Sequence, residues 1–172
     1  YNGSAWTELN DLNTGRSSLG ASGTSTAALA FGGFNASDPQ TRDDTETWNG
    51  TNWTEVNNLN TERNLISGCG TNTAALGFGG VPNRNETELW NGTNWTEVNN
   101  LNTGRQQLAG AGATNTASLA FGGNTGPGEV TELWNGTNWT EVNNLNTSRR
   151  ELGGSGTSTS AVGFGGANAR VQ

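Results

Sequence analysis

Bulky apolar residues recur along the chain in short alternating runs, separated by stretches rich in Asn, Thr and Gly. In one run Ala117, Leu119 and Phe121 alternate with Ser118 and Ala120. Alternation with a period of two predicts a β-strand with one bulky face and one nearly bare face. The equivalent residues elsewhere are Ala27, Leu29 and Phe31; Ala74, Leu76 and Phe78; and Ser160, Val162 and Phe164. Sheets with such faces are expected to stack, with the large side of one on the small side of the next.

These strands belong to a repeated unit. One stretch occurs unchanged at residues 48–61, 90–103 and 134–147, and a diverged copy opens the chain at residues 1–9. The second Trp of each unit is Trp6, Trp53, Trp95 or Trp139, which gives spacings of 47, 42 and 44 residues. Such a period fits a four-stranded β-propeller blade, and it also fits helical repeats of similar length. The abundance of Gly, Asn and Thr, which are poor helix formers, favours strands.

Each unit contains four predicted strands. The third unit has its first strand at residues 105–113 and its second at 116–122, closed by a Gly pair. The third and fourth strands are represented by residues 87–90 and 95–98 of the second unit, with Asn91 and Gly92 in the turn because both tolerate positive φ. Four residues separate the two Trp residues of this hairpin, so their rings are expected on the same side. The prediction is an all-β fold, with residues 1–172 forming one β-propeller domain of four blades, each of four antiparallel strands.

The two ends of the chain carry complementary parts of one unit. Residues 169–172 match the beginning of a third strand, as at residues 130–134, and Tyr1 matches the Trp that closes it. In one interpretation four blades close a ring, with this strand joined across the termini within one blade. In the other, the chain is a segment of a larger ring or of an oligomer. The first is favoured, since a closed ring has no exposed strand edges.

The order of a Gly pair, an aromatic residue, a Trp, a turn and an Arg before a Gly-rich strand resembles the kelch motif of β-propellers. The resemblance covers the whole chain in four copies. It departs at one position, where the usual Tyr is Trp48, Trp90 or Trp134 and only Tyr1 keeps it. The near-identical copies, rich in Asn, Thr and Gly, also resemble kelch-like repeats of phage and bacterial surface proteins, tail fibres included. This resemblance implies a virion-surface or secreted, extracellular location.

The composition and charge of the chain exclude several classes of partner and of active site. The net charge is −7 and all eight basic residues are Arg, so nucleic acid is a poor partner. No apolar run is long enough for membrane insertion. The hydrophobic share of 30% favours small cores repeated between stacked units over one large core. The absence of His excludes Ser-His-Asp triads and His metal sites, and the lone Cys69 is interpreted as a packing residue. We therefore expect no enzyme activity, no metal and no cofactor.

Four Arg residues recur ten positions after the second Trp of each unit: Arg16, Arg63, Arg105 and Arg149. Two interpretations are open. Each Arg forms an ion pair with a Glu that recurs in the same way, or caps carbonyl groups between blades. Alternatively, the four side chains surround the mouth of a central channel and attract an anion.

The copies differ mainly in two places. One is the connector after each Gly pair, at residues 34–42, 81–85, 124–129 and 167–170. The other is the pair of residues after each repeated Arg: Ser17 and Ser18, Asn64 and Leu65, Gln106 and Gln107, and Arg150 and Glu151. In an up-and-down blade both places lie on the same face, and repeat proteins commonly bind through the face that varies. The four Arg residues and these four pairs are therefore the candidate ligand-binding residues.

The leading hypothesis is a non-enzymatic binding module that recognises a glycan or protein receptor through this variable face. The alternative is a structural spacer or assembly unit of a fibre, without a ligand of its own. Either role is compatible with membership of a larger multi-chain assembly.

Overall fold

The structure is a computed structural model that describes residues 1, 3–124 and 128–168. These residues form sixteen strands and no helix, so the all-β prediction is confirmed. Accordingly, no membrane-spanning helix is found in this part of the chain. All strand pairs are antiparallel.

Three repeats each form a four-stranded sheet with neighbouring strands in chain order. The first sheet contains β1 (Gly20–Thr24), β2 (Ala27–Phe31), β5 (Thr45–Trp48) and β6 (Trp53–Val56). The second contains β7 (Ser67–Gly70), β8 (Ala75–Phe78), β9 (Thr87–Trp90) and β10 (Trp95–Val98). The third contains β11 (Ala109–Thr114), β12 (Ala117–Phe121), β13 (Thr131–Trp134) and β14 (Trp139–Glu141).

Two smaller sheets complete the fold. The fourth repeat contributes the pair β15 (Arg149–Gly156) and β16 (Ala161–Asn168). A short hairpin, β3 (Phe34–Asn35) and β4 (Gln40–Thr41), forms within the connector of the first repeat. The predicted strand order within a repeat is thus confirmed, and predicted bounds such as 87–90 and 95–98 are reproduced.

The hairpin between the third and fourth strands is nearly the same in each repeat. Trp90 and Trp95 face each other in the strand register, and their ring centroids lie 5.4 Å apart. Gly92 has a φ of +93°, as the turn requires. Asn91 contributes differently from the prediction, because its side-chain Oδ1 accepts hydrogen bonds from the backbone N–H groups of Thr93 and Asn94 at 2.9 and 2.8 Å.

The core is divided into layers between neighbouring sheets rather than gathered at one centre. Phe31 of the first sheet meets Trp95 of the second edge to face, at 4.8 Å between centroids. The indole N–H of Trp95 donates a hydrogen bond to Oγ1 of Thr45 in the first sheet at 3.0 Å. A Cβ on Gly68 would overlap the ring of Phe31, so the bare strand is what admits the large side chain. The predicted stacking of large faces on small faces is therefore confirmed.

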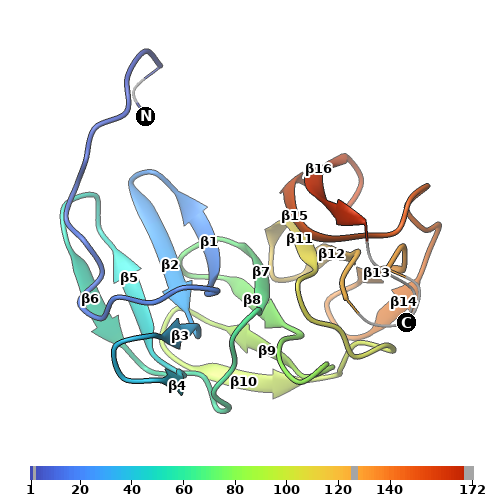
Figure 1. The fold of residues 1–172 in the computed structure, drawn as a ribbon, viewed down its shortest axis with the longest axis horizontal. Helices are drawn as coiled ribbons and strands as arrows, with labels where there is room; N and C mark the ends of the chain where they lie inside the picture. The colour runs from blue at the N-terminus through green and yellow to red at the C-terminus, as the bar shows by residue number, and fades with distance from the viewer. Residues whose placement is uncertain (2, 125–127, 169–172) are drawn as a thin grey trace.

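The first strands of the four repeats lie side by side. β1 packs against β7, β7 against β11, and β11 against β15 (Figure 1). Residues of all four strands line one cavity of about 250 Å³. Among the described residues, β1 and β15 are not packed together as their neighbours are, so this series of strands has two ends.

The predicted join of the chain ends within one blade is not seen among the described residues. There β16 pairs with β15 alone, and Tyr1 and residues 3–9 form no strand (Figure 1). The segment expected to supply the third strand, residues 169–172, lies outside the described residues. Trp6 joins no sheet formed by the described residues, and its side chain is 85% exposed.

Replacement of Trp90 by Ala is expected to destabilise the protein by about 3–5 kcal/mol, because a side chain that is 1% exposed is removed from an inter-sheet layer. The matched variant Trp6→Ala removes a residue of the same type that is 85% exposed, and should leave the unfolding midpoint nearly unchanged. Urea unfolding followed by circular dichroism measures both. Equal midpoints for the two variants would contradict the layered core.

Candidate ligand-binding face

Each of the first three repeated Arg residues forms an ion pair inside its own sheet. The Arg precedes the first strand, and the Glu lies in the third strand. The distances are 2.9 Å for Arg16 and Glu46, 2.7 Å for Arg63 and Glu88, and 2.9 Å for Arg105 and Glu132. The side chains in these pairs are 0–2% exposed. The pairs therefore belong to the interior of the sheets.

The buried carboxylate also binds the linker that enters each sheet. Oε2 of Glu88 accepts hydrogen bonds from the backbone N–H and the side-chain Nδ2 of Asn60, at 2.7 and 2.8 Å. Nη2 of Arg63 binds Glu88, and Nη1 of Arg63 donates a hydrogen bond to the backbone carbonyl of Glu86 at 2.8 Å. Burial lowers the pKa of Arg63, and the carboxylate of Glu88 opposes that shift. Burial lowers the pKa of Arg105 in the same way, opposed by Glu132.

These contacts decide between the two interpretations of the Arg series. Arg63 and Arg105 are fully buried and the side chain of Arg16 is 0% exposed, so these three cannot bind a ligand at the surface. We remove them from the candidate site. Arg149 is half-buried and donates to the carbonyl of Gly165 at 2.7 Å, and it has no ion pair within the described residues.

The variable pairs next to these Arg residues lie at one end of the series of four first strands. The second residue of each pair has positive φ, between +51° and +58°: Ser18, Leu65, Gln107 and Glu151. Their backbones form a ladder between repeats. Leu65 donates its N–H to the carbonyl of Ser18 at 2.8 Å, Gln107 to Leu65 at 3.2 Å, and Glu151 to Gln107 at 2.8 Å. We call these four the ladder residues.

The first residue of each variable pair is bonded to the variable connector of its own repeat. Ser17 and Phe34 exchange two backbone hydrogen bonds of 2.9 and 2.8 Å. The carbonyls of Asn64 and Gln106 accept from Val81 and Asn124 at 3.0 and 2.9 Å respectively. The two kinds of variable segment therefore share one end of the molecule, which we call the variable face.

Side chains also meet across repeats on this face. Asn64 donates to Oγ1 of Thr41 at 3.2 Å, and Arg150 donates to Oδ1 of Asn124 at 3.2 Å. Gln107 donates to the carboxylate of Glu151 at 2.5 Å. Ser17, Ser18 and Glu151 are exposed, whereas Asn64, Leu65, Gln106, Gln107 and Arg150 are half-buried. The structure thus brings these eight candidates together as one rim, which is polar except at Leu65.

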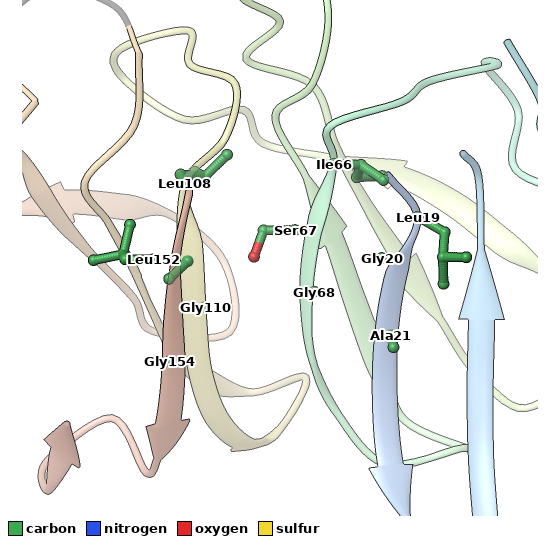
Figure 2. Close-up of a pocket in the computed structure, with 11 residues that line it drawn as sticks. Leu19, Gly20, Ala21, Ile66, Ser67, Gly68, Leu108, Gly110, Leu152 and Gly154 are labelled. Atoms are coloured by element: carbon green, nitrogen blue, oxygen red, sulfur yellow. The ribbon is translucent and has the colours of Figure 1, made fainter. Parts of the chain in front are cut away.

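Four aliphatic residues lie directly inside the rim, at positions that were not among the predicted site residues. Leu19, Ile66, Leu108 and Leu152 each follow a ladder residue, and with the first strands they line a cavity of about 230 Å³ (Figure 2). The last three are 5–8% exposed. Their signal in the sequence is an invariably aliphatic position beside a variable one. Because these aliphatic side chains are mostly buried, the surface that the cavity exposes is mainly polar, and the face is polar at the rim and in the hollow alike.

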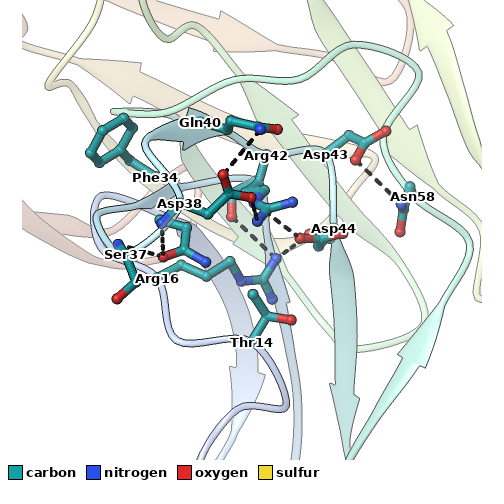
Figure 3. A network of polar contacts seen from close by, with 12 residues as sticks. Thr14, Arg16, Phe34, Ser37, Asp38, Gln40, Arg42, Asp43, Asp44 and Asn58 are labelled. Carbon is teal, nitrogen blue, oxygen red and sulfur yellow. Dashed lines mark hydrogen bonds and ion pairs between the residues drawn. The ribbon is translucent and has the colours of Figure 1, made fainter.

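The connector of the first repeat is the most elaborate part of the face (Figure 3). Asp38 forms an ion pair with Arg42 at 3.0 Å and accepts a hydrogen bond from Gln40 at 3.2 Å. Arg42 also lies 3.9 Å from a carboxylate oxygen of Asp44. Asp43 accepts from Asn58 at 3.3 Å. These acidic side chains are bound to neighbouring donors, and no cluster suited to a metal ion is found among the described residues.

The opposite end of the molecule is nearly constant between repeats. Its turns contain Asn, Gly and Thr, and each is bound to the neighbouring repeat in the same manner. Asn57 donates to the carbonyl of Thr93 at 3.0 Å and to Oδ1 of Asn94 at 2.7 Å. Asn99 makes the equivalent contacts in the next repeat. The two ends of the sheets therefore differ in how much they vary.

Comparison with known proteins does not assign the chain to a family. No protein-family model matches the chain, and no curated protein matches it. The resemblance to kelch repeats and to phage or bacterial surface proteins stays a prediction.

Replacement of Arg105 by Ala is expected to cost about 3–5 kcal/mol of stability, because it leaves the buried Glu132 charge without its partner. Glu132→Gln should be strongly destabilising for the reciprocal reason. The matched control is Arg84→Ala, which breaks a half-exposed pair with Glu86 and should cost about 1 kcal/mol or less. Equilibrium urea unfolding distinguishes them, and equal losses for Arg105→Ala and Arg84→Ala would contradict the structural role.

Cys69 is expected to resist thiol reagents in the folded protein. It is 6% exposed, and burial raises the pKa of its thiol to about 11, only partly opposed by a hydrogen bond with Ser118 of the neighbouring sheet. Ellman's reagent at pH 8 should therefore react slowly until denaturant is added. A rate equal to that of the unfolded chain would show that β7 and β12 are not packed together.

Proposed function

We propose that the four repeats form the blades of a β-propeller, and that the variable face of this propeller is a non-enzymatic binding site for a receptor, either a glycan or a protein. One observation carries the proposal. The variable pairs and the variable connectors of separate repeats are hydrogen-bonded together at one end, while the other end stays constant. Variation confined to one face is typical of repeat proteins that bind through it.

The chemistry of this face favours a polar ligand, such as a glycan. Asn64, Gln106, Gln107 and Asn124 offer planar amides, and Arg150 offers a guanidinium. Three of the eight Arg residues are neutralised in buried pairs, so the net charge of −7 resides on the remaining groups. The molecule as a whole is therefore acidic, which favours a neutral glycan or a basic protein surface over an acidic ligand.

The proposed location is a virion surface or an extracellular setting, in line with the resemblance to tail-fibre and bacterial surface proteins. Display of many copies on such a surface would strengthen a weak contact by avidity. The alternative function is a structural spacer or assembly unit of a fibre. Contacts between rim side chains of adjacent repeats favour this alternative. Gln107, for example, already donates a hydrogen bond to Glu151, so some polar groups of the face are bound within the molecule.

The test begins with a glycan array, with the chain presented in multivalent form. A ligand found there is then titrated against two variants. One carries Gln106, Gln107 and Arg150 changed to Ala on the variable face. The matched control carries Thr51, Thr93 and Thr137 changed to Ala in the exposed turns of the constant end. We expect the first variant to lose binding about tenfold or more, and the control to bind as the parent does.

Loss of binding only in the control would place the site at the opposite end. Equal binding by both variants and the parent would contradict the assignment of the site to the variable face. Absence of any ligand, on the array or among cell-surface proteins, would favour the spacer. Because both variants change only half-buried or exposed side chains, their unfolding midpoints should stay close to that of the parent, and this is checked in parallel.

A further inference from the structure

The first strand of each repeat presents a free backbone edge toward the centre of the molecule. β1, β7, β11 and β15 each pair with the second strand of their own repeat, and with no other strand among the described residues. Apart from the ladder, no backbone hydrogen bond joins neighbouring first strands in that part of the chain. The N–H and C=O groups on these edges therefore need partners from outside the sheets, since buried backbone groups are rarely left unpaired.

The hairpin register identifies the residues whose backbone faces the centre. In an antiparallel pair, residues that exchange hydrogen bonds with the partner strand alternate with residues whose N–H and C=O groups point away from it. In the second repeat Thr71 donates its N–H to the carbonyl of Ala74 at 3.0 Å, so Gly70 and Gly68 belong to the outward set. The equivalent positions in the other repeats are Ala21 and Gly23, Gly110 and Gly112, and Gly154 and Gly156.

These outward positions line two adjoining cavities. The first, which we call the rim cavity, is the space of about 230 Å³ inside the rim (Figure 2). The second has a volume of about 250 Å³ and is lined by the remaining length of the first strands. Ala21, Gly68, Gly110 and Gly154 line both. The lining contains only Gly, Ala, Ser, Cys, Leu and Ile, so no charged side chain of the described residues lines either cavity.

Ser67 adds an unbonded hydroxyl to the rim cavity. Its equivalents in the other repeats are Gly20, Ala109 and Gly153. Figure 2 shows its side chain pointing from β7 toward Gly110, on which a Cβ would lie 3.3 Å from Oγ of Ser67. Ser67 is 9% exposed, lines the rim cavity and has no hydrogen-bond partner for its hydroxyl within residues 1, 3–124 and 128–168. Because buried polar groups are as a rule hydrogen-bonded, this hydroxyl indicates a partner in the cavity.

We propose that the rim cavity binds the terminal unit of a glycan, a neutral sugar ring with free hydroxyl groups. The inference rests on the proposed receptor-binding function of the variable face, and it assigns the part of the ligand that enters the molecule. The strand edges offer both N–H donors and C=O acceptors, and Ser67 offers a hydroxyl. Sugar hydroxyls match this set because each can donate and accept. The rest of the glycan lies along the rim, at Gln106 and Arg150.

The lining selects against a charged terminal unit. A carboxylate or an ammonium group would lose hydration in a cavity that provides no opposite charge. The repeated Arg residues of the first three repeats cannot provide it, because each is paired with a Glu, as Arg63 is with Glu88 at 2.7 Å. The volume of about 230 Å³ is below the roughly 300–1,000 Å³ of pockets that enclose drug-sized ligands, so the cavity holds one ring rather than an oligosaccharide.

The test titrates the full chain, labelled with ¹⁵N-glycine, with the methyl glycosides of glucose, galactose and mannose. We expect at least one of them to shift the backbone amide signals of Gly68, Gly110 and Gly154 saturably, with a Kd in the millimolar range. The matching methyl uronide carries a carboxylate in place of the hydroxymethyl group and should bind about tenfold more weakly or worse.

Ser67→Ala should weaken the binding of the same hexoside about threefold to tenfold, the loss expected for one hydrogen bond. The third repeat already has Ala109 at this position, so the fold should tolerate the change. The matched control is Ser155→Ala, because Ser155 also belongs to a first strand but lines only the second cavity. It should bind the hexoside as the parent does.

The proposal is overturned if no hexoside shifts these glycine signals, if the uronide binds as tightly as its hexoside, or if Ser67→Ala binds as the parent does. Failure of the receptor function gives a different result. An array ligand that is lost in the Gln106, Gln107 and Arg150 variant, with no hexoside in the cavity, would retain the receptor site and remove the sugar site. Hexoside binding without any receptor would retain the sugar site alone.

Discussion

The fold depends on a carboxylate buried in the third strand of each complete sheet. A buried charge is tolerated only when it is paired and its remaining acceptor sites are filled. Here the repeated Arg supplies the opposite charge, and the linker from the preceding repeat supplies further N–H donors, as Asn60 does for Glu88. The same group therefore holds the first strand, the third strand and the connection between sheets. A repeat that lost its Glu would lose the position of its neighbour as well.

The second constraint is that backbone groups make the regular hydrogen bonds that hold the variable face together, whereas its side chains differ between repeats. The ladder residues bind one another through main-chain groups, and the connectors bind the variable pairs in the same way. Ser, Leu, Gln and Glu can therefore occupy equivalent positions, although each has a positive φ, a backbone conformation that is strained for every residue except Gly. The face varies because its geometry does not depend on which side chain is present.

Much of the architecture was predictable from the sequence. Alternation around Leu119 and Phe121, the repeated Asn-Gly turn and the spacing of the Trp residues led to the strands, the hairpins and the stacking of large on small faces. The burial of Arg63 and Arg105 was one of two open interpretations, because a recurring Arg suits an ion pair and a channel mouth equally well. Positive φ at Gln107 could not be predicted, since it arises from a hydrogen bond to another repeat that no local pattern encodes. The first strand of the third repeat begins at Ala109 rather than at Arg105, because its partner strand β12 ends at Phe121, opposite Ala109. The aliphatic positions of Leu108 and its equivalents were not predicted to lie at this face, because they hardly vary between the repeats while their neighbours do.

The identical segments at residues 48–61, 90–103 and 134–147 occupy the constant hairpins and the linkers. Between them lie stretches that each contain a complete pair, Arg63 with Glu88 or Arg105 with Glu132, together with one variable pair and one connector. Genetic recombination within the identical segments would exchange these stretches as whole cassettes and would never part an Arg from its Glu. The order and number of surface motifs could then change in a single event, without a new interface having to evolve between the repeats.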